Sequence, residues 1–268
     1  MNLFFREFGE GLPVIILHGL YGSSDNWLSL GKIMAENYHV YLLDQRNHGK
    51  SPHSKIHTYN AMQDDLLEFM DSKKLDKVNL IGHSMGGKTA MYFAIMHPER
   101  TASLTVVDIA PRSYQSLNRF SENSIFHLNV LNALLSIQPE KIKARHEAAE
   151  ILSQTIKEER VVNFLLKNLK YKKERGFYWS INLDALAQNL PNILGGIKED
   201  ILEKGFNQSP VMFIKGGNSS YIGEADLPLI KKVFPSAEIE IIPGASHWVH
   251  AEKPKEFLNC VLTFLKNQ

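Results

Sequence analysis

Short apolar segments rich in β-branched residues recur along the chain, and helical patterns separate several of them. Such segments predict buried strands, and the intervening helices are the crossovers that a parallel sheet requires. The predicted strands are Val14–Leu17, Val40–Leu43, Val78–Ile81, Leu104–Val107, Val211–Ile214 and Ile239–Ile242. The pattern therefore predicts an α/β fold with a mostly parallel central sheet flanked by helices.

This alternation stops between residues 112 and 204. Three amphipathic helices are predicted there with no strand between them, over Leu128–Ile137, Ile142–Ile156 and Glu159–Leu169. An insertion made mainly of helices between two sheet strands is typical of a cap. We therefore predict an α/β core of residues 1–111 and 205–268, and a helical cap of residues 112–204.

The third predicted strand runs directly into Gly-His-Ser84-Met-Gly-Gly, and a helical pattern from Lys88 to His97 follows. A G-x-S-x-G spacing between strand and helix is typical of a nucleophile elbow, a tight turn that exposes the serine hydroxyl. Gly82 and Gly86 lack the Cβ atoms that would collide where strand and helix cross. Ser84 is the predicted nucleophile.

The same residues also fit a second motif. Gly82 to Thr89 matches the phosphate-binding loop G-x-x-x-x-G-K-[ST], with Asp108 after the next strand as a magnesium ligand. The C-terminal Gly-Ala-Ser-His247 favours a hydrolase, because a serine nucleophile needs a general base and a phosphate loop does not. A nucleotide-binding protein is the alternative.

Two main-chain N–H groups are the expected oxyanion donors. One belongs to the residue after the nucleophile, Met85, and the other lies in the loop after the first core strand, at Leu20. As general base, His247 is preferred to His250 because it directly follows the Pro-Gly-Ala-Ser turn. Asp44 and Arg46 are interpreted as residues that fasten a loop through turn hydrogen bonds and ion pairs.

These pieces resemble the α/β-hydrolase superfamily over nearly the whole length. The segments that carry this resemblance are Pro13-Val-Ile-Ile-Leu-His-Gly and the motifs around Ser84 and His247. The loop Asp44-Gln-Arg-Asn-His-Gly-Lys-Ser51 is similar to that of a narrower group, the small bacterial YbfF-type esterases. The resemblance implies an α/β-hydrolase fold with a helical cap inserted after the sixth strand. It also implies hydrolysis of short- to medium-chain acyl esters, with acyl-CoA thioesters as further candidates. The mechanism requires no metal or organic cofactor.

The triad acid departs from the commonest pattern of that superfamily. The loop after the next-to-last strand, where the aspartate is expected, holds Asn218 and two serines. Asn218 could orient an imidazole but would not stabilise its positive charge. Asp108 ends the preceding strand, and adjacent parallel strands end side by side at one sheet edge. We predict Asp108 as the acid, with Glu224 and Asp226 as alternatives.

The composition of the chain narrows the classes of protein to which it could belong. The 268 residues, 44% of them hydrophobic, can bury one large core, and a net charge of +1 gives no general attraction to nucleic acid or membrane surfaces. No apolar run reaches the roughly 20 residues that cross a bilayer, and the N-terminus lacks signal-peptide features. The single cysteine, Cys260, is expected as a small buried apolar residue, and the histidines show no tight metal-ligand spacing. A cytoplasmic protein is expected.

The substrate is expected to be a small acyl ester or thioester. Tyr21 and Trp248 adjoin the predicted oxyanion donor and base, so they are candidates for substrate binding. Cap aromatics are candidates for the wall of an acyl pocket: Phe126, Phe164, Phe177 and Trp179. A basic run could meet the phosphates of coenzyme A, although a solvated helix end is preferred: Lys167, Lys170, Lys172, Lys173 and Arg175.

Other functions share this fold and triad. They include the pyruvate-eliminating lyase of menaquinone synthesis, a carbon–carbon bond hydrolase, a perhydrolase, and a ligand receptor with little turnover.

Overall fold

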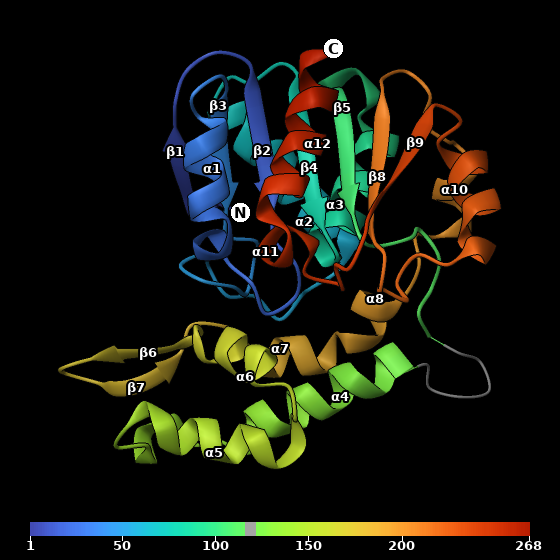
Figure 1. Cartoon of the computed structure of the whole chain (residues 1–268). Helices are drawn as coiled ribbons and strands as arrows, with labels where there is room; N and C mark the ends of the chain where they lie inside the picture. The colour runs from blue at the N-terminus through green and yellow to red at the C-terminus, as the bar shows by residue number, and fades with distance from the viewer. Residues whose placement is uncertain (116–121) are drawn as a thin grey trace.

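The computed structural model describes residues 1–115 and 122–268, so residues 116–121 of the predicted cap lie outside the described part. Figure 1 shows a central sheet with helices on both faces and, below it, a smaller layer of helices with one hairpin. Among the described residues, no helix has both the length and the apolar content to span a membrane.

The central sheet has seven strands in the order β1-β3-β2-β4-β5-β8-β9. The edge strand β1 runs antiparallel to β3, and every other pairing is parallel. The central strands are buried on both faces, as expected for parallel strands covered by helices. The strands are β1 (Phe5–Phe8), β2 (Pro13–Leu17), β3 (His39–Leu43), β4 (Val78–His83), β5 (Thr101–Val107), β8 (Val211–Gly216) and β9 (Ala237–Ile242).

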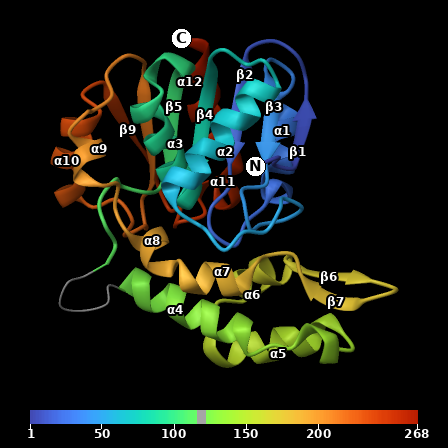
Figure 2. The same cartoon turned by 180° about the vertical axis from the view of Figure 1, so that it is seen from behind.

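Helices cover both faces of this sheet. In Figure 1 the near face carries α1 (Leu28–Met34), α11 (Val249–Glu252) and α12 (Pro254–Lys266). Figure 2 shows α2 (Tyr59–Ser72) and α3 (Met85–Met96) on the opposite face, with α9 (Glu199–Leu202) and α10 (Leu227–Val233) beside them. Cys260, in α12, is half-buried with its thiol against Met212.

The cap faces the carboxyl ends of the parallel strands, the edge at which substrate sites of α/β folds gather (Figure 1). Its elements are α4 (Glu122–Leu135), α5 (Arg145–Thr155), α6 (Glu159–Leu166), β6 (Leu169–Lys172), β7 (Gly176–Trp179), α7 (Leu183–Gln188) and α8 (Leu190–Leu194). Four short 3-10 helices complete the described elements: η1 (Ser24–Trp27), η2 (Pro98–Arg100), η3 (Pro139–Lys141) and η4 (Glu224–Asp226).

Two sequence predictions about the cap were wrong. The cap follows β5, the fifth strand of the chain rather than the sixth, because a single strand, β1, precedes β2. The cap also contains an antiparallel hairpin, β6–β7, where no strand was predicted. Gly176 has a φ of +77°, a backbone conformation that suits glycine and closes the tight turn between the two strands.

The chain enters and leaves the cap through two segments that lie side by side, which we call the neck (residues 111–114 and 194–197). The N–H of Tyr114 donates to the carbonyl of Leu194 at 2.8 Å, and that of Ile197 donates to Pro111 at 3.0 Å. Lys88 of α3 joins both segments, since its ammonium donates to the carbonyl of Arg112 at 3.0 Å and to that of Gly195.

Candidate active site

Ser84 occupies the turn between β4 and α3 with φ +52° and ψ −116°, a conformation unusual for a residue with a Cβ. The turn is tight enough to require its glycines. A Cβ on Gly82 would lie 2.3 Å from the carbonyl oxygen of Gly86, and one on Gly86 would lie 2.3 Å from that of Leu17. The N–H of Ser84 donates to the carbonyl of Val107 at 3.0 Å, which ties the turn to β5. The geometry is that of a nucleophile elbow.

Asp108 and His247 meet at the same edge of the sheet. The Nδ1 of His247 lies 2.8 Å from the Oδ2 of Asp108, a carboxylate that is fully buried at the end of β5. The carboxylate also accepts the N–H of Gly216, at 3.0 Å on Oδ1, and the hydroxyl of Ser219 on Oδ2. Because Asp108 accepts the proton on Nδ1, the Nε2 of His247 is left as the basic nitrogen.

Tyr221 fixes the other side of the imidazole. Its ring stacks on His247 with centroids 3.7 Å apart and 16° between the planes. Burial, together with the charge of Asp108, raises the pKa of the Tyr221 phenol, so it stays protonated at neutral pH. The imidazole is thus held by a hydrogen bond along one edge and by a ring across one face.

Ser84 and His247 line the same cavity, and no hydrogen bond joins them in the described part of the chain. Catalytic hydrogen bonds in free enzymes are often long and shorten when substrate binds.

The alternative base and acid are engaged elsewhere. His250 stacks on Trp27, 4.1 Å between centroids, and burial lowers the pKa of His250 to about 3. Asp226 pairs with Arg112 at 2.5 Å. Asn218 donates its backbone N–H to Ala245. Glu224 lies in η4, in the same loop as Asp226.

Leu20 and Met85 lie beside the serine, Met85 as the next residue in the chain and Leu20 on the wall of the same cavities. Both residues are buried, and within the described residues neither N–H has an assigned acceptor in the protein. The loop that carries Leu20 is held in place by His18, whose Nε2 accepts the N–H of Gln45 at 2.9 Å. Two N–H groups beside the serine are the arrangement that an oxyanion requires.

The interpretation of the Asp44–Ser51 loop is confirmed. Asp44 accepts two backbone N–H groups, from Ser24 at 2.6 Å and Lys50 at 2.8 Å. Arg46 forms a bidentate ion pair with Asp65, with nitrogen–oxygen distances of 2.6 and 2.8 Å. These residues fasten the loop beside the elbow.

A first cavity opens onto Ser84. Tyr21 and Trp248 line it, together with the cap aromatics Phe126 and Phe164. Phe177 packs instead against Tyr171 within the hairpin. Trp179 lines a separate pocket with residues 181–184.

A second cavity also reaches Ser84. Lys88, Tyr59 and Tyr114 line it, and the polar group of each already donates to a backbone carbonyl. Leu20, Ser84, His127 and Tyr221 line both cavities and so form the boundary between them.

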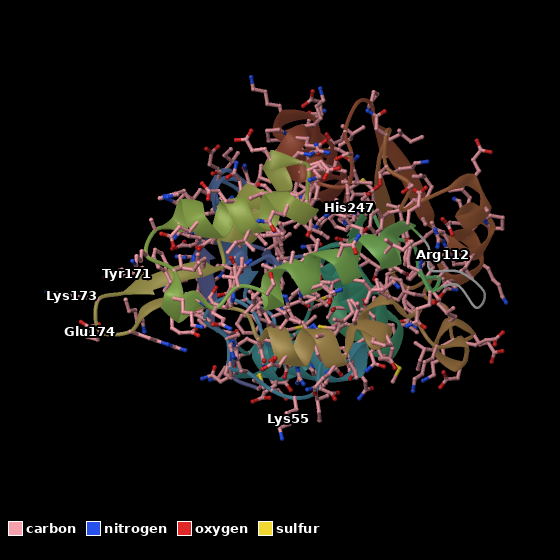
Figure 3. All side chains as sticks on the ribbon, turned by 90° about the horizontal axis from the view of Figure 1, so that it is seen from below. Lys55, Arg112, Tyr171, Lys173, Glu174 and His247 are labelled. Carbon is pink, nitrogen blue, oxygen red and sulfur yellow. The ribbon has the colours of Figure 1, made fainter. Side chains whose placement is uncertain are left out.

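Of the basic run, Lys167 lies at the C-terminal end of α6, and the other four residues lie on the hairpin β6–β7 and its turn. In Figure 3, the view from the cap side, Tyr171, Lys173 and Glu174 lie at the far end of the hairpin, well away from His247. Within the described residues, no three His, Cys, Asp or Glu side chains gather as a set of metal ligands.

Comparison with known proteins identifies the fold family. A family model described as the alpha/beta hydrolase fold matches residues 13–254. The chain belongs to the α/β-hydrolase family. This membership removes the interpretation of Gly82–Thr89 as a phosphate-binding loop.

Individual members extend the comparison. The chain is 40% identical to a zebrafish (Danio rerio) protein named sn-1-specific diacylglycerol lipase ABHD11, over 99% of this chain and 83% of that protein. It is 34% identical to esterase YbfF of Escherichia coli K12, over 95% and 93% of the two chains. A solved structure titled as a marine microorganism esterase superposes with a TM-score of 0.92 at 45% identity, covering 98% of each chain. The chain is a serine hydrolase of the esterase type, and its resemblance to YbfF-type esterases is confirmed.

Three residues of this α/β-hydrolase site were not singled out from the sequence: His127, Tyr221 and Lys88. Tyr221 ends the loop in which the triad acid was sought, so its position carried a usable signal. Lys88 lies one helical turn after the nucleophile and therefore faces the same side of α3. His127 comes from the cap, and its arrival beside Ser84 depends on how the cap docks.

Proposed function

We propose that this protein is an esterase that hydrolyses short- to medium-chain acyl esters through a Ser84–His247–Asp108 triad. The observation that carries the proposal is the 2.8 Å contact between His247 Nδ1 and the buried carboxylate of Asp108, at the edge where Ser84 is exposed by the elbow. Serine is a weak nucleophile until a base takes its proton, and the base must be oriented by a third group.

The reaction follows from these positions. His247 Nε2 removes the proton of Ser84 Oγ as the oxygen attacks the acyl carbonyl carbon. The carbonyl electron pair moves onto oxygen, where the N–H groups of Leu20 and Met85 stabilise the anion. The intermediate collapses, the bond to the alcohol breaks, and His247 returns the proton to the leaving oxygen. Water, deprotonated by His247, then releases the acid from the acyl-enzyme, and Ser84 recovers its proton.

The lining of the first cavity suits an acyl chain. Apart from His127 its cap wall is apolar, with Phe126 and Phe164 near the half-buried Trp248 of the core. With the acyl chain in the first cavity, the second cavity, which also reaches Ser84, is left for the alcohol portion. Tyr21 and Trp248 are proposed as substrate contacts on this basis.

Thioesters and acylglycerols are narrower proposals. The name of the zebrafish relative gives diacylglycerol as that protein's substrate, so acylglycerols belong in the substrate panel. Acyl-CoA would need a cationic site for its phosphates, and the basic hairpin lies far from His247 (Figure 3).

Hydrolysis of p-nitrophenyl esters from acetate to palmitate tests the proposal directly. Turnover is expected with the native protein, with an optimum at short or medium chains, and it should disappear in Ser84→Ala. Turnover that persists in Ser84→Ala at the native rate would refute the assignment of the nucleophile. No turnover with any ester would refute the esterase.

A further inference from the structure

His127 is a buried cap histidine that the triad does not use. It lies in α4 with a relative exposure of 8%, and it lines both cavities that reach Ser84. Of the described cap residues that wall the first cavity, His127 is the polar one, since the others are Phe, Val and Leu.

One nitrogen of His127 has a partner and the other has none. Its Nε2 lies 3.2 Å from the hydroxyl of Tyr221, the ring that stacks on His247. Its Nδ1 is buried and, among the residues that the structure describes, makes no hydrogen bond. A buried polar atom without a partner is costly, and native structures keep few of them without a purpose.

The ring position is fixed by the core. The hydroxyl of Tyr21 donates to the backbone carbonyl of His127 at 3.4 Å, and the two rings are 5.8 Å apart. Together with the Tyr221 contact, these interactions anchor the imidazole above the boundary between the cavities. Burial lowers the pKa of His127 to about 3, so the ring is neutral at physiological pH.

A neutral imidazole presents a donor or an acceptor at Nδ1, depending on which way the Tyr221 hydrogen bond runs. A hydroxyl group satisfies either case, because it both donates and accepts. His127 also lines the second cavity, which is assigned to the alcohol portion of the ester. The substrate group that meets His127 therefore belongs to the alcohol side of the ester.

We propose that His127 is a substrate-binding residue that hydrogen-bonds, through Nδ1, a free hydroxyl on the alcohol portion of the ester, close to the scissile bond. The proposal rests on the esterase function and deepens it, since it selects esters of polyols over esters of simple alcohols. It assigns this selectivity to the cap rather than to the elbow.

Two isosteric esters test the proposal: 2-hydroxyethyl butyrate and propyl butyrate, which differ by a hydroxyl in place of a methyl group. We expect the native protein to favour the hydroxyethyl ester in kcat/KM by about tenfold, since the unpaired nitrogen finds its partner only in that complex. The preference should lie mainly in KM. Equal values for the two esters in the native protein would overturn the proposal without any variant.

Two matched variants locate the effect. His127→Asn places an amide group near the position of Nδ1, and His127→Gln extends its amide toward that of Nε2 and the Tyr221 hydroxyl. We expect His127→Asn to keep most of the preference and His127→Gln to lose it, each measured as the ratio of kcat/KM for the two esters within the same variant. Thermal unfolding of each variant confirms that it is folded.

The outcomes separate this proposal from the esterase itself. An unchanged preference in folded His127→Gln would overturn the role of His127 while leaving the esterase intact. If the native protein hydrolysed neither butyrate ester nor any p-nitrophenyl ester, both proposals would fail.

Discussion

At the scale of single residues, two buried carboxylates near the sheet edge are held in different ways. Asp108 accepts from the imidazole of His247, the N–H of Gly216 and the hydroxyl of Ser219. Asp226 pairs with the guanidinium of Arg112 and accepts the N–H of Gly223. Hydrogen bonding to uncharged groups lets a carboxylate stabilise a neighbouring imidazolium, whereas an arginine pair already neutralises it.

Asp108→Asn tests this distinction. We expect kcat for p-nitrophenyl butyrate to fall by about 10³- to 10⁴-fold, because the neutral amide neither fixes the proton on Nδ1 of His247 nor stabilises its cation. The melting temperature should change little, since an isosteric amide keeps most of the hydrogen bonds. Steady-state kinetics and thermal unfolding measure the two effects.

Asp226→Asn is the matched control, because Asp226 is also a buried aspartate and lies in the loop that was the alternative source of the acid. It should lower stability through the loss of the Arg112 ion pair and retain kcat within about tenfold of the native value. If Asp226→Asn abolished turnover and Asp108→Asn did not, the acid would have been assigned to the wrong loop.

Residues within a motif were predictable, and residues that meet across the cap were not. Ser84 and His247 carry sequence signatures, and Asp108 followed from the rule that neighbouring parallel strands end together. The structure brings these three to one edge, and their catalytic roles remain predictions. His127 and Tyr221 approach each other over 94 residues of sequence, and no local spacing encodes that contact.

At the scale of elements, the β6–β7 hairpin bears on the thioester question. The hairpin carries four of the five residues of the basic run, and its turn lies away from His247 (Figure 3). Solvated lysines separated from a site by more than a Debye length, about 8 Å at physiological salt, contribute little to binding there.

We therefore expect the triple variant Lys172→Gln, Lys173→Gln, Arg175→Gln to leave kcat/KM within about twofold of native for p-nitrophenyl butyrate and for butyryl-CoA. The two substrates serve as mutual controls, because only one of them carries phosphates. A KM that rises for butyryl-CoA alone would place the coenzyme on the hairpin.

At the neck of the cap, the protonation of Lys88 makes the stability of the protein depend on pH. Burial lowers the pKa of Lys88 to about 7, against about 10.4 for a lysine in an unfolded chain. Between these values the unfolded chain binds a proton that the folded protein does not, so the free energy of unfolding rises with pH, by up to about 1.4 kcal/mol per pH unit. The neutral amine still has two N–H donors for the carbonyls of Arg112 and Gly195.

Lys88→Met should remove this pH dependence. In urea unfolding at pH 7, 8 and 9, the free energy of unfolding of the native protein is expected to rise relative to that of Lys88→Met at each step. Lys77→Met, at an exposed position, is the control and should follow the pH dependence of the native protein. Parallel curves for native protein and Lys88→Met would show that Lys88 stays charged through this range.

Elements were predictable where the pattern was long and repetitive. The six apolar runs correspond to β2, β3, β4, β5, β8 and β9, because each is buried on at least one face. The four-residue strands β1, β6 and β7 were missed, since short strands at an edge or in a hairpin need few apolar positions. The lysines of β6 were assigned to a helix end although Gly176 and the aromatic run after it favour a hairpin.

At the scale of the whole molecule, buried neutral histidines surround the elbow. Burial lowers the pKa of His57, His127 and His250 to about 3, and lowers the pKa of His48 and His83 well below its ordinary value. Their rings pack on one another or on aromatic neighbours rather than on carboxylates.

This arrangement predicts acid lability. As pH falls from about 6.5 toward 3, these histidines take up protons in the unfolded chain and not in the folded one, so the free energy of unfolding decreases. Each one contributes a slope of up to about 1.4 kcal/mol per pH unit. Urea unfolding at pH 7, 6 and 5 should show a progressive loss, reduced in His250→Phe, which keeps a ring on Trp27. Stability that is constant from pH 7 to 5 would contradict this account.

The neck has a consequence for how such an enzyme diversifies. Because the N–H of Tyr114 reaches the carbonyl of Leu194, the two points where the core chain is interrupted are already in hydrogen-bonding contact. The cost of closing a loop across such a short distance rises slowly with the length of the loop, since the entropy of closure grows with the logarithm of that length. The intervening segment can therefore be lengthened, shortened or exchanged with little effect on the sheet. In an evolving lineage, substrate preference can drift with the cap while the chemistry below it is inherited unchanged.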